Sequence, residues 1–197
     1  MLRCLWSLAW PERLTLASAL AMLLLSWSAE SQQALQTQTN PPTIAAALEV
    51  QRIRQVILGV MKSIDARRWQ ALRGEFADTV LVDYTSLFGG YPRNYTVVDL
   101  IENWRQLLAP FSMTRHDLGP IDVEIDGGEA KAKCPVHIYH FLHGAPGGEE
   151  WVVNGEYRVT LKRRYGRWRI QKIVLDVQSQ EGNTNLLVEA FAPADGR

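Results

Sequence analysis

Cysteine is scarce in this sequence of 197 residues, which contains only Cys4 and Cys134. Cys4 lies in a segment that we expect to be removed, so the mature chain would keep one thiol and form no internal disulfide. This excludes a small scaffold held together by disulfides. Cys134 fits a small hydrophobe on a buried strand better than a reactive thiol, because no basic helix terminus is evident beside it.

The sequence also lacks an excess of either charge, because 21 Lys and Arg residues balance 21 Asp and Glu residues. A chain without net charge has no global field that would draw it to nucleic acid or anionic lipid. Its 47% hydrophobic residues are typical of a globular protein, and its length suits one sizeable core. We therefore expect a neutral or weakly charged small-molecule ligand and no nucleic-acid partner.

A long membrane-spanning run is missing as well. The apolar run at residues 14–27 (LTLASALAMLLLSW) is shorter than the ~20 residues that a transmembrane helix needs. It follows a basic start that includes Arg13 and precedes the small residues Ser28 and Ser31, which is the layout of a secretory signal peptide. We expect residues 1–31 to be cleaved after one of these serines, so that the protein meets the membrane only in transit and is secreted or periplasmic.

After a polar segment at residues 32–43, which we interpret as a linker, the apolar residues recur at helical spacing. One stripe of a long amphipathic helix is formed by Ala46, Val50, Ile53, Ile57, Val60 and Ile64. Asp65 is placed to cap a shorter second helix. That helix would continue the stripe through Trp69, Leu72 and Phe76. Thr96 and Asp99 form a capping-box-like pair at the start of a third helix, which Pro110 ends.

The second half of the chain changes from helical to alternating periodicity. It predicts four long strands at residues 115–126, 129–142, 150–164 and 167–179, after one short strand at residues 80–85. Helices followed by an antiparallel meander indicate an α+β fold, and Gly119 and Gly155 inside long strands indicate bending. We expect one domain over residues 44–182, in which three N-terminal helices and a curved antiparallel sheet enclose a pocket. Residues 183–197 would form a tail or lid.

Alternation in the strand at residues 129–142 separates an apolar face from a polar one. His140 lies on the apolar face, whereas His137 stands among lysines on the opposite face. An inward histidine is either a hydrogen-bonded core residue or a functional group on a pocket wall, and the pattern leaves both open.

Three further residues are ambiguous by pattern alone. Tyr157 points inward, as a core tyrosine with a bonded hydroxyl or as part of a pocket. Tyr84, ahead of a Gly-rich loop, fits a pocket wall or an ordinary edge residue. Gly119 and Pro120 interrupt the parity of their strand, so alternation does not decide which side His116 faces.

Short motifs in a fixed order resemble a known family. They are IDARRW at 64–69, VDYTS at 82–86, TRH at 114–116, His140, and GRWRI at 166–170. Together they resemble the SnoaL-like branch of the nuclear-transport-factor-two-like superfamily, with scytalone dehydratase as the nearest pattern, over nearly all of the predicted domain. The resemblance implies a cone-shaped α+β barrel around a deep pocket, with no metal and no organic cofactor. Because such sheets often pair back to back, we also expect a homo-oligomer.

The resemblance further implies a catalytic set of Asp65, His116, His140 and Tyr84. A carboxylate at Asp65, bonded to one ring nitrogen of His116, would fix the tautomer and leave the other nitrogen as a base. This role can coexist with helix capping by Asp65. His140 and Tyr84 would polarise a carbonyl and protonate a departing hydroxyl group. The expected substrate-binding residues are Tyr157, Trp69, Val136 and Ile138.

The expected function is that of a cofactor-independent dehydratase-like lyase or isomerase acting on a small cyclic or polyketide-like hydroxy-carbonyl compound. Scytalone itself is not expected, because Gly155 and Tyr157 depart from the polar pair of the dehydratase pattern and export is foreign to intracellular members. One alternative is a non-catalytic exported small-molecule-binding protein on the same fold. Another is an assembly subunit that uses the outer face of the sheet, where His137, Tyr139, Glu156 and Arg158 lie.

Overall fold

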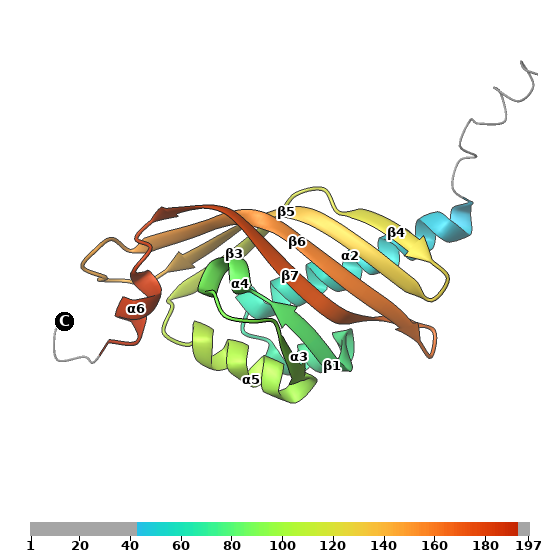
Figure 1. Cartoon of the computed structure of the whole chain (residues 1–197), viewed down its shortest axis with the longest axis horizontal. Coiled ribbons are helices and arrows are strands. Elements are labelled where there is room, and N and C mark those ends of the chain that lie inside the picture. The colour runs from blue at the N-terminus through green and yellow to red at the C-terminus, as the bar shows by residue number, and fades with distance from the viewer. Residues whose placement is uncertain (1–42, 193–197) are drawn as a thin grey trace, which may run out of the picture. The chain divides into compact units, whose positions relative to one another are not determined.

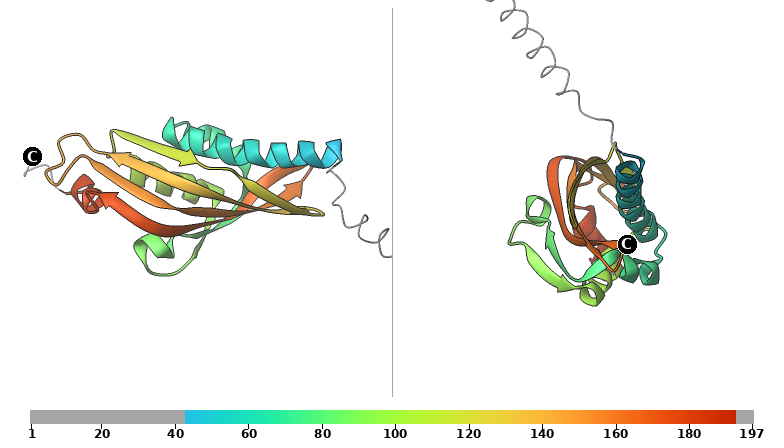
Figure 2. Two further views of the ribbon diagram at one scale, coloured as in Figure 1. Left: turned by 90° about the horizontal axis from the view of Figure 1, so that it is seen from above. Right: turned by 90° about the vertical axis from the view of Figure 1, so that its right-hand side faces the viewer.

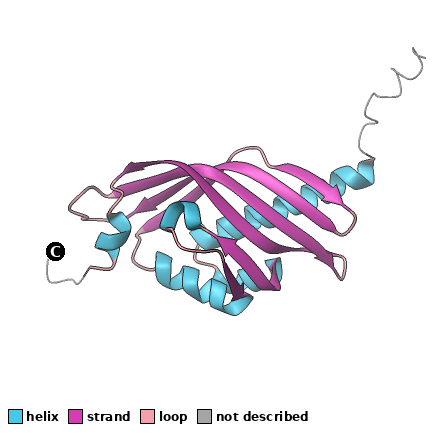
Figure 3. Ribbon diagram, in the orientation of Figure 1, coloured by secondary structure: helices cyan, strands magenta, loops and turns pink. Residues whose placement is uncertain are grey.

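A curved seven-stranded sheet is the centre of the computed structural model, which describes residues 43–192 (Figures 1 and 3). The strands lie in the order β2-β1-β7-β6-β5-β3, and β4 pairs with the remaining length of β5. Their bounds are β1 Phe76–Asp83, β2 Arg93–Thr96, β3 Met113–Leu118, β4 Asp122–Asp126, β5 Glu129–Phe141, β6 Glu150–Arg164 and β7 Arg167–Gly182. All neighbouring strands are antiparallel except β1 and β7, which are parallel.

Five α-helices and one 3-10 turn accompany the sheet in the described part of the chain. They are α2 Ile44–Asp65, α3 Trp69–Leu72, the 3-10 turn Arg73–Glu75, α4 Thr85–Phe88, α5 Val97–Leu108 and α6 Leu186–Ala190. The long helix α2 lies on the side toward which the sheet bends and contacts β3, β4 and β7 (Figure 2). Helix α5 packs against β1 and β2. The predicted stripe of α2 is buried from Ile53 to Ile64 and exposed in the first turn.

The predicted α+β class and the curved sheet are confirmed, and several details differ. The sheet stays open and does not close into a barrel. Four helices, and not three, precede β3 among the described residues.

The predicted strand at 115–126 is also divided at Gly119 and Pro120 into β3 and β4. Pro120 has no N–H to donate, and Gly119 donates its N–H to the carbonyl of Pro135 as the chain turns, at 2.9 Å.

The bend of the long strands has a local cause at Gly155. The β6–β7 register shifts between Asn154 and Gly155, which marks a β-bulge. A Cβ at Gly155 would overlap the backbone oxygen of Asp176 on β7, so glycine alone allows this close approach. The sheet can therefore curve around the helices at this point.

The predicted signal at residues 1–31 and nearly all of the predicted linker lie outside the described residues. Within residues 43–192, no helix is both long enough and apolar enough to cross a membrane. At the other end, α6 packs into the core, where Leu186 has no exposed surface. Asn183 anchors this segment by donating its side-chain amide to the carbonyl of Gly148 at 2.9 Å.

Candidate active site

An acid and a histidine are bonded to each other where α2 ends beside β3. Asp65 Oδ1 lies 2.7 Å from His116 Nδ1, and Asp65 Oδ2 accepts the backbone N–H of His116 at 2.9 Å. The hydroxyl of Thr114 makes a longer bond of 3.4 Å to the same carboxylate. Because Nδ1–H donates to the carboxylate, the ring exposes a free Nε2 on its other side. This is the arrangement of a histidine prepared as a base.

The fold explains why this carboxylate is free for His116. Asp65 is the last residue of α2, and α3 begins at Trp69 with Arg68 at its N-cap position and no side-chain cap. The expected capping role of Asp65 is therefore wrong. Strand β3 ends the sheet, so some of its N–H groups point away from β5. The carboxylate of Asp65 accepts a hydrogen bond from one of these groups, the backbone N–H of His116.

The strand register decides the direction that alternation left open. His116 pairs with Ile138 and Thr114 pairs with His140, and these four side chains share the inner face of the sheet. The parity is interrupted after His116, at the turn between β3 and β4. His137 lies on the outer face as predicted, with Nδ1 at 2.6 Å from the amide oxygen of Asn154.

A cavity of about 60 Å³ lies beside His116. Its polar wall consists of His116, His140, Tyr84 and Tyr157, and Ile138 lines it as well. Most of the remaining wall is apolar and comes from Met61, Ile64, Leu87, Phe88, Trp104 and Leu107. The cavity is much smaller than the ~300–1,000 Å³ of typical ligand pockets. It can surround the reacting atoms of a substrate without holding a whole ring compound.

His140 is a buried histidine on this wall. Its ring stacks on Trp151, with centroids 4.6 Å apart, and contacts the ring of Phe111 at 5.1 Å. Burial lowers the pKa of His140 to about 4, and the charges on His116 and Arg67 act in the same direction. His140 is therefore neutral near pH 7 and can donate one N–H to a carbonyl oxygen.

Two tyrosines complete the polar wall. Burial raises the pKa of Tyr84 and of Tyr157, so both hydroxyl groups stay protonated near pH 7. Tyr157 is 3% exposed, and its ring lies nearly parallel to that of His116 with centroids 6.4 Å apart. Both tyrosines can therefore donate a hydrogen bond to developing negative charge.

Two of the expected substrate-binding residues are not on the cavity wall. Trp69 lines a surface cleft between α3 and α5, where the guanidinium of Arg67 lies 5.8 Å from its ring centroid. Val136 is buried in the core opposite Gly155. Alternation predicted the correct face for Val136, but it carries no information on where along β5 the cavity lies.

Several residues of the apolar wall were not expected from the sequence patterns. Leu87 and Phe88 belong to α4, in a segment whose Gly and Pro content predicted a loop. On α5, the apolar spacing of Val98, Ile101, Trp104 and Leu108 predicts a buried stripe that does not include Leu107. Trp104 belongs to that stripe, and its position was the one available signal that α5 closes the pocket.

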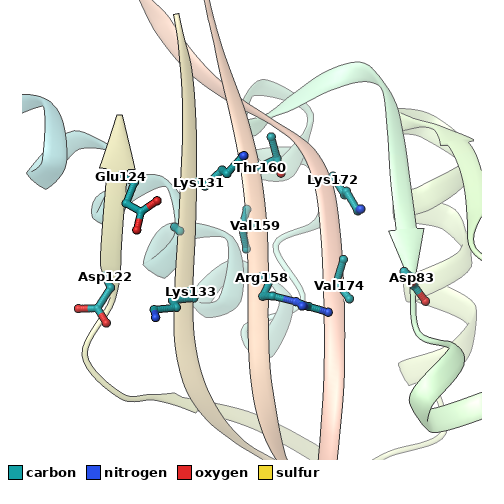
Figure 4. Close-up of a pocket in the computed structure, with 11 residues that line it drawn as sticks. Asp83, Asp122, Glu124, Lys131, Lys133, Arg158, Val159, Thr160, Lys172 and Val174 are labelled. Atoms are coloured by element: carbon teal, nitrogen blue, oxygen red, sulfur yellow. The ribbon is translucent and has the colours of Figure 1, made fainter. Parts of the chain in front are cut away.

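A second hollow, of about 380 Å³, lies on the outer face of the sheet (Figure 4). Its basic residues lie on the three central strands and its acidic residues on the two flanking strands: Lys131 and Lys133 on β5, Arg158 on β6, Lys172 on β7, Asp122 and Glu124 on β4, and Asp83 at the end of β1. Arg158 pairs with Asp176 at 2.6 Å. No histidine lines this hollow, and among the pockets formed by residues 43–192 only the inner cavity is lined by histidines.

Comparison with known proteins identifies the family of this chain. The family model of the SnoaL-like domain matches residues 45–174. This chain belongs to the SnoaL-like family. The predicted resemblance is thereby confirmed, and a search of curated protein sequences finds no match.

Several solved structures share the fold of this chain. The Kfla4162 protein of Kribbella flavida has a TM-score of 0.69 and 24% identity, over 73% of this chain and 99% of that one. A candidate scytalone dehydratase of Novosphingobium aromaticivorans has a TM-score of 0.61 and 15% identity, over 69% and 88%. A type-3 LinA hexachlorocyclohexane dehydrochlorinase of Novosphingobium barchaimii has a TM-score of 0.57 and 14% identity, over 69% and 90%. The fold is thus related to that of proteins named for elimination reactions.

Proposed function

We propose that this SnoaL-like protein is a cofactor-independent acid/base enzyme, a dehydratase-like lyase or an isomerase, that acts on a small hydroxy-carbonyl compound. One observation carries the proposal: the carboxylate of Asp65 holds both the ring and the backbone of His116, whose other ring nitrogen is left for the cavity. A paired carboxylate also stabilises the imidazolium that forms when the ring takes a proton.

The reaction begins with removal of a proton from the carbon next to a carbonyl group. His116 Nε2 removes this proton, and the electron pair of the broken C–H bond moves into an enolate. The N–H of His140 and the hydroxyl groups of Tyr84 and Tyr157 stand on the same wall to bind the enolate oxygen. In a lyase, the enolate then expels a β-hydroxyl group as the C–O bond breaks, and this group takes the proton from the His116 imidazolium and leaves as water, which returns His116 to its neutral form. In an isomerase, the proton returns to a different carbon.

The shape of the site bears on the substrate. A surface groove of about 380 Å³ shares Tyr84, Phe88, Trp104 and Leu107 with the cavity, so these side chains form a common wall. A cyclic or polyketide-like substrate would place its reacting carbons in the cavity and its remainder in the groove. This requires Phe88, which is 49% exposed, to move aside.

The test is exchange of the substrate α-proton for deuterium in D₂O, followed by NMR, with β-hydroxy ketones and cyclic hydroxy-ketones as probes. Enone absorbance reports elimination in parallel. His116→Ala should slow exchange by at least ~100-fold. His137→Ala is the matched control, because this histidine is exposed on the outer face, and it should exchange at the wild-type rate. Normal exchange by folded His116→Ala would refute the assignment.

The apolar part of the wall also fits a non-catalytic small-molecule-binding protein. That function predicts a bound ligand whose α-carbon lies beyond hydrogen-bond reach of both His116 and His140, together with no exchange in the same assay. A crystal structure with the tightest-binding probe distinguishes the two functions.

The proposal includes the setting in which the protein acts. We propose that the chain is exported after cleavage near Ser28 or Ser31 and that the mature form self-associates through the outer face of its sheet. N-terminal sequencing of the exported protein tests the cleavage, with an intact residue 1 as the contradicting result. Analytical ultracentrifugation tests the association, with a monomer mass at all concentrations as the contradicting result.

A further inference from the structure

Arg67 occupies a backbone position that normally belongs to glycine. Its N–H donates to the carbonyl of Ile64 at 3.0 Å, and the N–H of Arg68 donates to Ser63 at 2.8 Å. This pair of bonds is a Schellman motif that ends α2, with Arg67 at the C′ position and φ at 57°. A non-glycine residue is strained there. Glycine would avoid this strain at position 67. The contacts of the arginine side chain offer a reason for its presence there.

The guanidinium of Arg67 ties the end of α2 to the end of α5. Nη2 donates to the carbonyl of Leu108, the last residue of α5, at 2.9 Å and to that of Phe111 at 3.4 Å. A cation is favourable at a helix C-terminus, where carbonyl groups lack partners within the helix. The same contact fixes Phe111, whose ring lies against His140.

Two buried nitrogen atoms remain without a hydrogen-bond partner on this side of the site. They are Nη1 of Arg67 and Nδ1 of His140, and His140 is 8% exposed. The charge of Arg67 acts on His140 against protonation, which reinforces the larger effect of burial. The titratable and charged groups around His140 are Asp65, Arg67, His116, Tyr84 and Tyr157.

We propose that Arg67 is a positioning residue of the site, which holds Phe111 against His140 and keeps His140 a neutral hydrogen-bond donor. Asp65 and Arg67, two residues apart at the corner after α2, then have opposite tasks. The acid favours a protonated His116 after proton transfer, whereas the cation disfavours a protonated His140. The catalytic part of this inference rests on the proposed function, but the state of His140 does not.

The test is NMR titration of the four histidine side chains, assigned with His140→Gln, in four proteins: wild type, Arg67→Gly, Arg67→Lys and Arg68→Ala. Arg67→Gly removes the side chain and relieves the strained backbone. It should shift the midpoint of His140 upward, because a cation that opposes protonation is removed and Phe111 loses its tether. Arg67→Lys retains the charge and should restore the wild-type midpoint. Arg68→Ala, at an exposed neighbour, should change nothing.

Once a substrate is known, Arg67→Gly should also lower kcat by at least ~10-fold with little change in KM. This is the result expected for a group whose effect is on the transition state. An unchanged His140 midpoint in folded Arg67→Gly overturns the proposal, as does a lysine variant that behaves like glycine. If Arg67→Gly does not fold, the Arg67→Gln and Arg67→Lys variants can be compared instead, because they place a neutral and a charged side chain at the same position. Because the titration needs no substrate, its result is independent of whether the protein proves to be an enzyme.

Discussion

Replacing Asp65 by Asn keeps the shape of the side chain but removes its charge and one hydrogen-bond acceptor. The substitution therefore tests what the carboxylate contributes to the site. The carboxylate accepts two short hydrogen bonds, one from the His116 ring and one from the His116 backbone. An amide can accept one of them, and its NH₂ group then faces the other donor. If the amide oxygen keeps the backbone N–H, the NH₂ group donates to Nδ1 and forces the proton onto Nε2. The nitrogen that should act as the base is then blocked.

The size of the effect follows from these bonds. A hydrogen bond to a charged group contributes ~1.5–3 kcal/mol, which corresponds to a factor of ~10–150 in rate if it is lost from the reacting state. Loss of general-base catalysis adds to this, so we expect kcat to fall by ~10²–10⁴ with a small change in KM. The free energy of unfolding should fall by only ~1–3 kcal/mol, because one of the two bonds survives.

Asp117→Asn is the matched control for this substitution. Asp117 lies next to His116 on β3 but is exposed and pairs with Arg115 at 2.9 Å. Surface pairs of this kind contribute ~0–1 kcal/mol, so the control should keep both activity and stability. The assays are α-proton exchange and urea unfolding. A folded Asp65→Asn protein within a few-fold of the wild-type rate would contradict the tautomer argument.

Three further predictions concern stability and access. The folded pKa of His140, about 4, lies below the ordinary value of 6.5, so the protein should lose up to ~3 kcal/mol of unfolding free energy as the pH falls from 6.5 to 4, and His140→Gln should flatten this slope in urea titrations. Phe88→Ala should lower KM for bulky probes and leave it unchanged for small ones, as measured by steady-state kinetics. Gly155→Ala should lower the free energy of unfolding by at least ~2 kcal/mol, because its Cβ would overlap Asp176, whereas Gly59→Ala in α2 meets open space and should raise it by ~0.5–1 kcal/mol.

Periodicity predicted the parts of the fold where one face is uniformly apolar. Ile53, Ile57 and Val60 in α2 are fully buried as the three-and-four spacing indicated, and β5 alternates as predicted through His140. The short strand β2 was missed because four residues at a sheet edge, with mostly exposed side chains, leave no periodic signal. The parallel pairing of β1 with β7 was missed too, since it joins residues about ninety positions apart and no local pattern encodes it.

The candidate site divides in the same way. His140 and Tyr157 could be assigned to the inner face by parity, because their strands are long and uninterrupted. The bond between Asp65 and His116 could not be worked out from spacing, since it depends on where the end of α2 meets the edge of β3. Trp69 and Val136 were expected to bind substrate but do not line the cavity. An apolar residue on the correct face lines the cavity only if the helices leave space beside it. Resemblance to a family supplied the pairing that periodicity could not.

The register of β3 against β5 is what converts these residues into one site. His116 lies opposite Ile138 and His140 lies opposite Thr114, so the two histidines are diagonal neighbours on one face of the sheet. A slip of one residue would turn His116 to the outer face while His140 stayed inside. The carboxylate of Asp65 opposes this slip, because it binds the backbone N–H and the ring of the same residue and so recognises one register only. The group proposed to activate the base is therefore also the group that keeps the base on the cavity wall.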